Sequence, residues 1–142
     1  MALDAKGLVL MNSVNGILSN ELGSFEIIEG LEFVYKAYVT EGVVKLFVTT
    51  GRDVTDEEYN EVYDEYESDV LVDEGYDVEE IEDEYNPVWR INFPYKEDYD
   101  DMNEDLNYVI SYHKKEMNRI FEKINSWMHC IQLSPFYGNI LG

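Results

Sequence analysis

The sequence predicts an α+β protein in which an antiparallel sheet is covered on one face by a long C-terminal helix. Two patterns support this class: apolar residues alternate with a period of two early in the chain, and they recur at helical spacing late in it. The chain has 142 residues, enough for one domain with its own core. We expect that domain to span residues 1–130 and residues 131–142 to form a C-terminal tail.

A β-meander is expected in the N-terminal part of the chain. Asn15-Gly16 follows a short apolar run and is a favoured dipeptide of the type I′ hairpin turn. Residues 25–28 are strand-like, with Gly23 and Gly30 as the expected breaks. A second hairpin is expected around Glu41-Gly42. Its predicted cross-strand pairs are Val39–Val44, Ala37–Leu46 and Tyr35–Val48 on an apolar face, and Tyr38–Lys45 and Lys36–Phe47 on a mixed face.

Two short acidic helices are expected next. Thr55 and Glu58 fit a capping box, in which each side chain accepts a hydrogen bond from the backbone of the other residue. The apolar residues that follow at helical spacing are Tyr59, Val62, Tyr63, Tyr66 and Val70. Asp77 begins a similar cap pattern, with Tyr76 and Ile81 spaced as a hydrophobic staple. We therefore expect a second short helix that ends before Asn86-Pro87.

One later strand and the long helix complete the predicted fold. In Val88 to Phe93, Trp89 and Ile91 alternate with polar residues, as in a strand with one covered face. The long helix is expected from about Tyr99 to Cys130. The stripe that should cover the sheet comprises Met102, Leu106, Val109, Ile110, His113, Met117, Ile120, Phe121, Ile124 and Met128.

The net charge of −21 is concentrated in one segment. Residues 53–105 carry 23 acidic and two basic side chains, residues 1–52 carry six and four, and residues 106–142 carry two and four. Direct binding to nucleic acid or to an anionic membrane surface is not expected, because both are polyanions. Such an asymmetry of charge indicates a surface that interacts with a partner of opposite sign.

Little in the sequence indicates a metal site or a disulfide. The acidic window 73–84 does not fit a calcium-binding loop, since Val78 stands where the sixth position needs glycine. His129 and Cys130 are adjacent, so their side chains diverge on a helix and do not form a nucleophile–base pair. Cys130 is the single cysteine and cannot form an internal disulfide. With no signal-peptide core and no apolar run of membrane length, a cytoplasmic location is expected.

Three residues were considered for acid–base chemistry. His113 lies in the apolar stripe, where a buried, hydrogen-bonded histidine is commoner than a ligand or a catalytic base. Glu26 and Glu32 lie among apolar strand residues and are the carboxylates that could point inwards. A pocket between the sheet and the long helix, lined by His113 and one of these acids, would indicate an enzyme or a small-ligand protein. We expect no cofactor, no metal and no catalytic residue.

Four short segments form a recognisable set: Glu21-Leu22-Gly23-Ser24, Arg52-Asp53-Val54, Gly75-Tyr76-Asp77-Val78-Glu79-Glu80 and Asp83-Glu84-Tyr85-Asn86-Pro87. In these segments the chain resembles a family of small acidic bacterial proteins, and the resemblance covers about residues 7–128. That family has no assigned function, so the resemblance implies no site residues.

The sequence thus predicts a non-enzymatic interaction protein that binds a basic protein partner through the acidic, tyrosine-rich segment 56–105. An inhibitor or a mimic of nucleic acid would act in this way. The predicted contact residues are Asp77, Glu79, Glu80, Glu82, Asp83, Glu84, Tyr76, Tyr85 and Tyr99. The alternatives are the pocket protein described above and a domain whose acidity serves solubility alone. The oligomeric state stays open.

Overall fold

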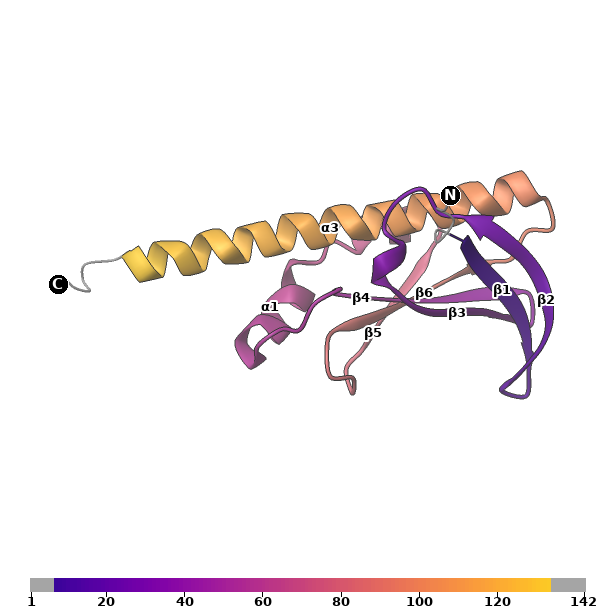
Figure 1. Cartoon of the computed structure of the whole chain (residues 1–142), viewed down its shortest axis with the longest axis horizontal. Coiled ribbons are helices and arrows are strands. Elements are labelled where there is room, and N and C mark those ends of the chain that lie inside the picture. Colours follow the sequence, from indigo (N-terminus) through magenta and orange to yellow (C-terminus); the bar gives the residue numbers. More distant parts are fainter. Residues whose placement is uncertain (1–6, 134–142) are drawn as a thin grey trace.

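The chain forms an α+β structure with a six-stranded sheet and one long helix, described for residues 7–133 in a computed structural model (Figure 1). Side chains are described as far as Ser126. The elements are β1 (Gly7–Val14), β2 (Ile17–Glu26), the 3₁₀ turn η2 (Leu31–Phe33), β3 (Val34–Thr40), β4 (Val43–Thr49), α1 (Asp56–Glu65), α2 (Asp69–Asp73), β5 (Asp77–Ile81), β6 (Val88–Pro94) and α3 (Tyr99–Leu133). The predicted class is therefore confirmed.

The sheet is mixed rather than wholly antiparallel. Its strand order is β2-β1-β3-β4-β6-β5, and β1 meets β3 in parallel at Asn12 and Val39. The simple meander was wrong because the chain leaves β2, crosses back near α3 and enters β3 beside β1. Gly30 permits this crossing: its φ is 95°, and a Cβ there would lie 2.8 Å from the Ile110 side chain.

Both predicted hairpin turns are present. Asn15 and Gly16 have φ angles of 55° and 81°, and Glu41 and Gly42 have 52° and 78°, the positive values that a type I′ turn requires. The predicted pairs of the second hairpin are correct except one, because a register shift between Val34 and Lys36 places Val34 opposite Val48. Tyr35 is extruded there and is exposed. Gly23 is not a break and lies within β2.

The second predicted helix is wrong, because residues 77–81 form the edge strand β5. The segment alternates: Asp77 and Glu79 pair with Asn92 and Arg90 of β6, whereas Val78 is opposite the buried Ile91. An acidic N-terminal cap pattern and a short strand with charges on one face look alike in sequence, and pairing with β6 decides between them. The expected staple of Tyr76 and Ile81 is therefore absent. The second short helix is α2, one turn long and located before β5.

The long helix covers the sheet as predicted. Every described member of the predicted stripe is buried except Phe121, which is partly buried. Met128 and the tail residues Phe136, Tyr137, Ile140 and Leu141 lie outside the described side chains. A helix of 35 residues is about 52 Å long, more than twice the length of the seven-residue strands β4 and β6, along which it runs (Figure 1). Beyond the sheet, α3 therefore has α1 alongside it (Figure 1).

Candidate functional site

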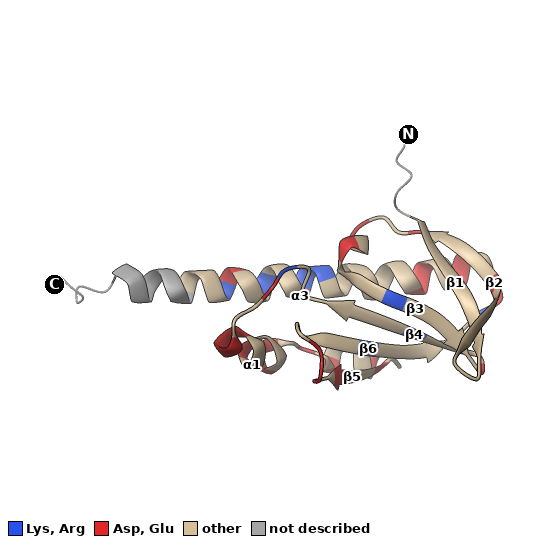
Figure 2. Ribbon diagram, turned by 60° about the horizontal axis from the view of Figure 1, so that its bottom comes forward, with Lys and Arg blue, Asp and Glu red and all other residues tan. Residues whose placement is uncertain are grey.

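Acidic side chains of α1, of β5 and of the turn between β5 and β6 lie near one another on the surface. We call this group the acidic cluster: Asp64, Glu80, Glu82, Asp83 and Glu84. Asp64 and Glu82 both act electrostatically on Glu80, which places the carboxylates of helix and turn near one another. Figure 2 shows acidic residues on α1 and on the adjacent end of β5. The sequence predicted the last four members and missed Asp64, which contributes from the preceding helix.

Tyrosine side chains of α1 fix the backbone of this turn. The Tyr59 hydroxyl lies 3.0 Å from the carbonyl oxygen of Glu82 and 2.9 Å from that of Glu84, and it can donate to either. The Tyr63 hydroxyl lies 2.9 Å from the carbonyl oxygen of Ile81 and accepts from the Val88 amide. The capping box of α1 is complete, as predicted. The carboxylates of the turn are therefore carried on a backbone held in place by α1.

The acidic cluster has unrelieved like-charge repulsion. Partial burial, together with the neighbouring charges of Glu82 and Asp64, raises the pKa of Glu80. No ion pair involves Glu80, Glu82, Asp83 or Glu84 within the described residues. Tyr85, in the same turn, has 79% of its surface exposed. The turn thus combines crowded carboxylates with one accessible aromatic ring.

Asp77 and Glu79 lie on the other face of β5 and are compensated there. The Asn92 amide donates to Asp77 and to Glu79, each over 2.8 Å, and the Arg90 guanidinium is 2.6 Å from Glu79. Glu80 instead shares the face of Val78, toward α3. The six predicted acids therefore do not form one surface.

The three predicted tyrosines are also separated. Tyr76 is half-buried between Phe93 and Tyr108, with ring centroids 5.3 and 6.0 Å away, and burial raises its pKa to about 12. Tyr99 is in the first turn of α3 and stacks on Phe25 of β2 at 4.9 Å. Only Tyr85 accompanies the acidic cluster. As expected, Tyr63 and Tyr66 belong to the core, and Tyr59 packs against it.

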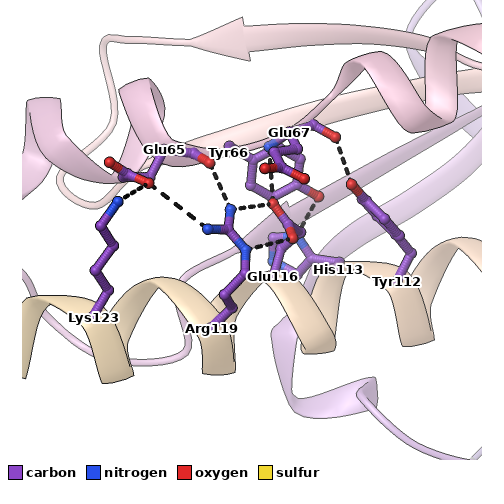
Figure 3. Close-up of polar contacts among 8 residues, drawn as sticks. All are labelled: Glu65, Tyr66, Glu67, Tyr112, His113, Glu116, Arg119 and Lys123. Atoms are coloured by element: carbon purple, nitrogen blue, oxygen red, sulfur yellow. Dashed lines mark hydrogen bonds and ion pairs between the residues drawn. The ribbon is translucent and has the colours of Figure 1, made fainter.

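Where the end of α1 meets α3 lies a polar group that the sequence did not predict (Figure 3). We call it the α1–α3 junction: Glu65, Tyr66 and Glu67 on one side and Tyr112, His113, Glu116, Arg119 and Lys123 of α3 on the other. The Glu116 carboxylate is buried and accepts from the Glu67 amide at 2.8 Å and from the Arg119 guanidinium at 2.9 and 3.0 Å. In the sequence, the spacing of three residues between Glu116 and Arg119, beside the apolar stripe, was the feature that could have indicated this junction.

The junction explains where α1 ends. At Tyr66 the backbone turns to an extended conformation, so the ring points to α3. Its hydroxyl lies 2.9 Å from Nδ1 of His113, and Nε2 of the histidine lies 2.7 Å from the Thr49 carbonyl oxygen. Because a carbonyl only accepts, Nε2 donates to it and Nδ1 accepts from Tyr66. The predicted helical stripe ended early, and Val70 lies in α2, exposed.

His113 has no access to a substrate. It is fully buried against the rings of Trp89, Tyr66 and Phe33, and burial lowers its pKa to about 4. The inward orientation of Glu26 and Glu32 was wrong, since both are exposed. Two surface grooves of about 540 and 480 Å³ flank residues 27–32, and His113 lines neither of them. The predicted convergence of His113 with Glu26 or Glu32 is absent.

The described part of the chain holds no group of three or more histidine, cysteine or acidic side chains that could bind a metal ion. Nor does any described helix have the length and apolar content to cross a membrane. Searches of curated proteins and of solved structures find no match to this chain. A model of a protein family of unknown function, DUF6762, matches residues 3–129. The chain therefore belongs to the DUF6762 family.

Proposed function

We propose that the protein is a non-enzymatic interaction protein that binds a basic protein partner through the acidic cluster and Tyr85. The observation that carries the proposal is the grouping of acidic side chains on β5 and the β5–β6 turn, where burial and, second to it, the charges of Glu82 and Asp64 raise the pKa of Glu80. A cationic partner would relieve that repulsion, so binding gains energy that solvent-exposed single carboxylates do not offer.

Two further features support a basic partner. The turn backbone is held by Tyr59 and Tyr63, so little conformational entropy is lost when a partner binds. Tyr85 is exposed beside the carboxylates, and a tyrosine ring provides contact area and a face for a guanidinium group. Arginine-bearing surfaces of a basic enzyme or nucleic-acid-binding protein fit this chemistry.

The experiment compares capture of proteins from a lysate of the source organism by three forms of the chain. One is native, and one carries Glu80→Gln, Glu82→Gln, Asp83→Asn and Glu84→Gln. The third is a matched control that loses the same charge at four exposed acids elsewhere: Glu21→Gln, Glu26→Gln, Glu32→Gln and Glu41→Gln.

We expect a basic protein that the native chain and the control retain, that salt releases, and that the first variant fails to hold. Because each screened ion pair contributes little, the four changes together should weaken binding by about ten- to a hundred-fold. If the two variants behave alike, net charge and not the acidic cluster is responsible, and the proposal fails. If no form retains a basic protein, the acidity serves solubility.

A further inference from the structure

One face of the sheet packs against α3, and the other points away from it (Figure 1). On β3 and β4 the side chains toward α3, such as Val39 and Leu46, belong to the core. The alternate side chains form two rows across the sheet, because each row follows the register of β3, β4 and β6. One row is Lys36, Phe47 and Arg90, and the other is Tyr38, Lys45 and Asn92. We call these six residues the basic face.

Two lysines of the basic face have no ion pair with any residue that the structure describes. Lys36 and Lys45 are diagonal neighbours on adjacent strands, so their backbones are about 7–8 Å apart. Arg90 is paired with Glu79, but its Nε is buried without an acceptor among the described residues. Apart from Lys115, the other described basic residues form ion pairs: Arg52, Lys96, Lys114, Arg119 and Lys123. In a chain with 31 acidic residues, the two lysines are therefore a local excess of positive charge.

Aromatic rings lie against the lysine side chains of this face. Phe47 is only 7% exposed although it is not part of the core that packs against α3. Nζ of Lys36 lies 4.7 Å from the centroid of the Phe47 ring, and the Tyr38 ring lies 6.0 Å from it. Tyr35 is exposed next to them, with its ring centroid 5.8 Å from the same Nζ. An ammonium group held over aromatic rings loses less conformational entropy when a partner binds than a freely moving one does.

The charges of the basic face select a short anionic partner. Free ammonium groups donate to carboxylate or phosphate oxygens. A long polyanion such as nucleic acid does not fit, because it would meet Asp77 and Glu79 on the neighbouring strand β5 and would be repelled by a chain of charge −21. A short acidic segment needs the two lysines alone. In an extended segment, carboxylates two residues apart are separated by about 7 Å, which matches the spacing of Lys36 and Lys45.

We propose that the basic face binds a short, extended acidic segment of a partner protein, in which two carboxylates pair with Lys36 and Lys45. The rings of Tyr35 and Tyr38 lie in the same strand as Lys36 and supply contact area for the rest of the segment. This proposal does not rest on the acidic cluster, which has the opposite charge and lies at the β5–β6 turn.

The test is a titration of the isotope-labelled chain with a capped peptide of six glutamates, followed by the chemical shifts of the backbone amides. We expect saturable shifts centred on residues 35–38 and 44–47. The double variant Lys36→Gln with Lys45→Gln should bind the peptide about tenfold more weakly, because two ion pairs are lost. A capped peptide of six glutamines, which has no carboxylates, should not bind.

The matched control is Lys96→Gln with Lys115→Gln, which removes the same charge at two exposed lysines outside the basic face and should bind like the native chain. The proposal is overturned if hexaglutamate does not bind, if the shifts centre elsewhere, or if both double variants bind alike. Tighter binding of a thymidine hexanucleotide would also overturn it, in favour of nucleic acid. Circular dichroism checks that the variants fold. If the variant at Lys36 and Lys45 does not fold, the location of the shifts in the native chain decides.

Discussion

The two edges of the sheet differ in charge and in how they are held. At the β5 edge, hydroxyl groups of Tyr59 and Tyr63 bond to the backbone of the turn, and carboxylates crowd around it. At the β2 edge, the described side-chain bonds within the hairpin come from Ser19 alone, and apolar side chains face solvent. The charged edge therefore presents a fixed surface for a partner of opposite sign. The β2 edge carries fewer charges, those of Glu21 and Glu26, beside exposed apolar side chains.

The largest expected effect is a loss of stability on acidification, caused by protonation of His113 in the α1–α3 junction. This junction joins α1, which holds the charged edge, to α3. Burial lowers the pKa of His113 from 6.5 to about 4, so between these values the unfolded chain binds more protons than the folded one. The histidine's contribution is complete above pH 6.5 and is lost as the pH falls toward 4. A pKa lowered from 6.5 to about 4 corresponds to roughly 3 kcal/mol.

Urea unfolding of the native chain and of His113→Gln, measured from pH 4 to 7, checks this. The free energy of unfolding of the native chain should fall more steeply with acidification than that of the variant. The difference between the two isolates the histidine from the many carboxylates that also titrate. Parallel curves would mean that His113 is not held neutral. Exchange of amides in residues 13–19 should respond to pH alike in both, because the hairpin is remote from the junction.

Next in size is the loss of Glu116. Glu116→Ala removes three charge-assisted hydrogen bonds, two from Arg119 and one from the Glu67 amide, and should cost about 2–3 kcal/mol of unfolding free energy. Glu122→Ala is the control, since Glu122 is exposed on the same helix and should change stability by less than about 0.5 kcal/mol. Equal effects of both substitutions would show that the junction contributes nothing beyond helix propensity. Binding at the charged edge should weaken in Glu116→Ala and should persist in Glu122→Ala.

A smaller effect is expected from the hydroxyl of Tyr59. Tyr59→Phe keeps the ring but removes the donor to the carbonyl oxygens of Glu82 and Glu84, at a cost of about 1 kcal/mol. Amides of residues 82–85 should exchange faster in this variant. Tyr85→Phe is the control, because Tyr85 is exposed and its hydroxyl makes no hydrogen bond to any residue that the structure describes. If exchange in the turn is unchanged by Tyr59→Phe, the turn is rigid for another reason and the comparison between the edges loses its basis.

How far the sequence predicts the fold follows from the range of the interactions involved. The hairpin turns, the capping box of α1 and the stripe of α3 depend on residues close in sequence, and all were predicted. The parallel contact of β1 with β3 and the strand β5 depend on neighbours that are remote in sequence. The local pattern at Asp77 satisfies a helix cap equally well, so only pairing with β6 identifies the strand.

The candidate site also has parts that local sequence patterns predict and parts that depend on residues remote in sequence. Charge counting located the acids at residues 80–84, but it could not separate them from Asp77 and Glu79, which face Arg90 and Asn92 on the other side of β5. Two residues one position apart in a strand lie on opposite faces, and the helix expected there would have grouped them together. Glu116 was missed because its partners come from Glu67, 49 residues away, as well as from Arg119.

The smallest predicted effect is a change in the stability of the variant Glu80→Gln, and it tests the charged edge most directly. Because the pKa of Glu80 is raised in the folded chain, its charge opposes folding above that pKa, and the opposition disappears as the pH falls and the group is protonated. Glu80→Gln should therefore stabilise the chain at neutral pH by a few tenths of a kcal/mol, a gain kept small by solvent screening. Part of the gain should shrink as salt is added, because salt screens the repulsion from Glu82 and Asp64 but does not change the burial of the carboxylate, which is the larger cause of the raised pKa. Glu21→Gln on β2 is the matched control at the other edge, because Glu21 is exposed and does not belong to the acidic cluster. A gain of equal size at both positions would mean that net charge alone is being reduced, and the acidic cluster would then have no special repulsion for a basic partner to neutralise.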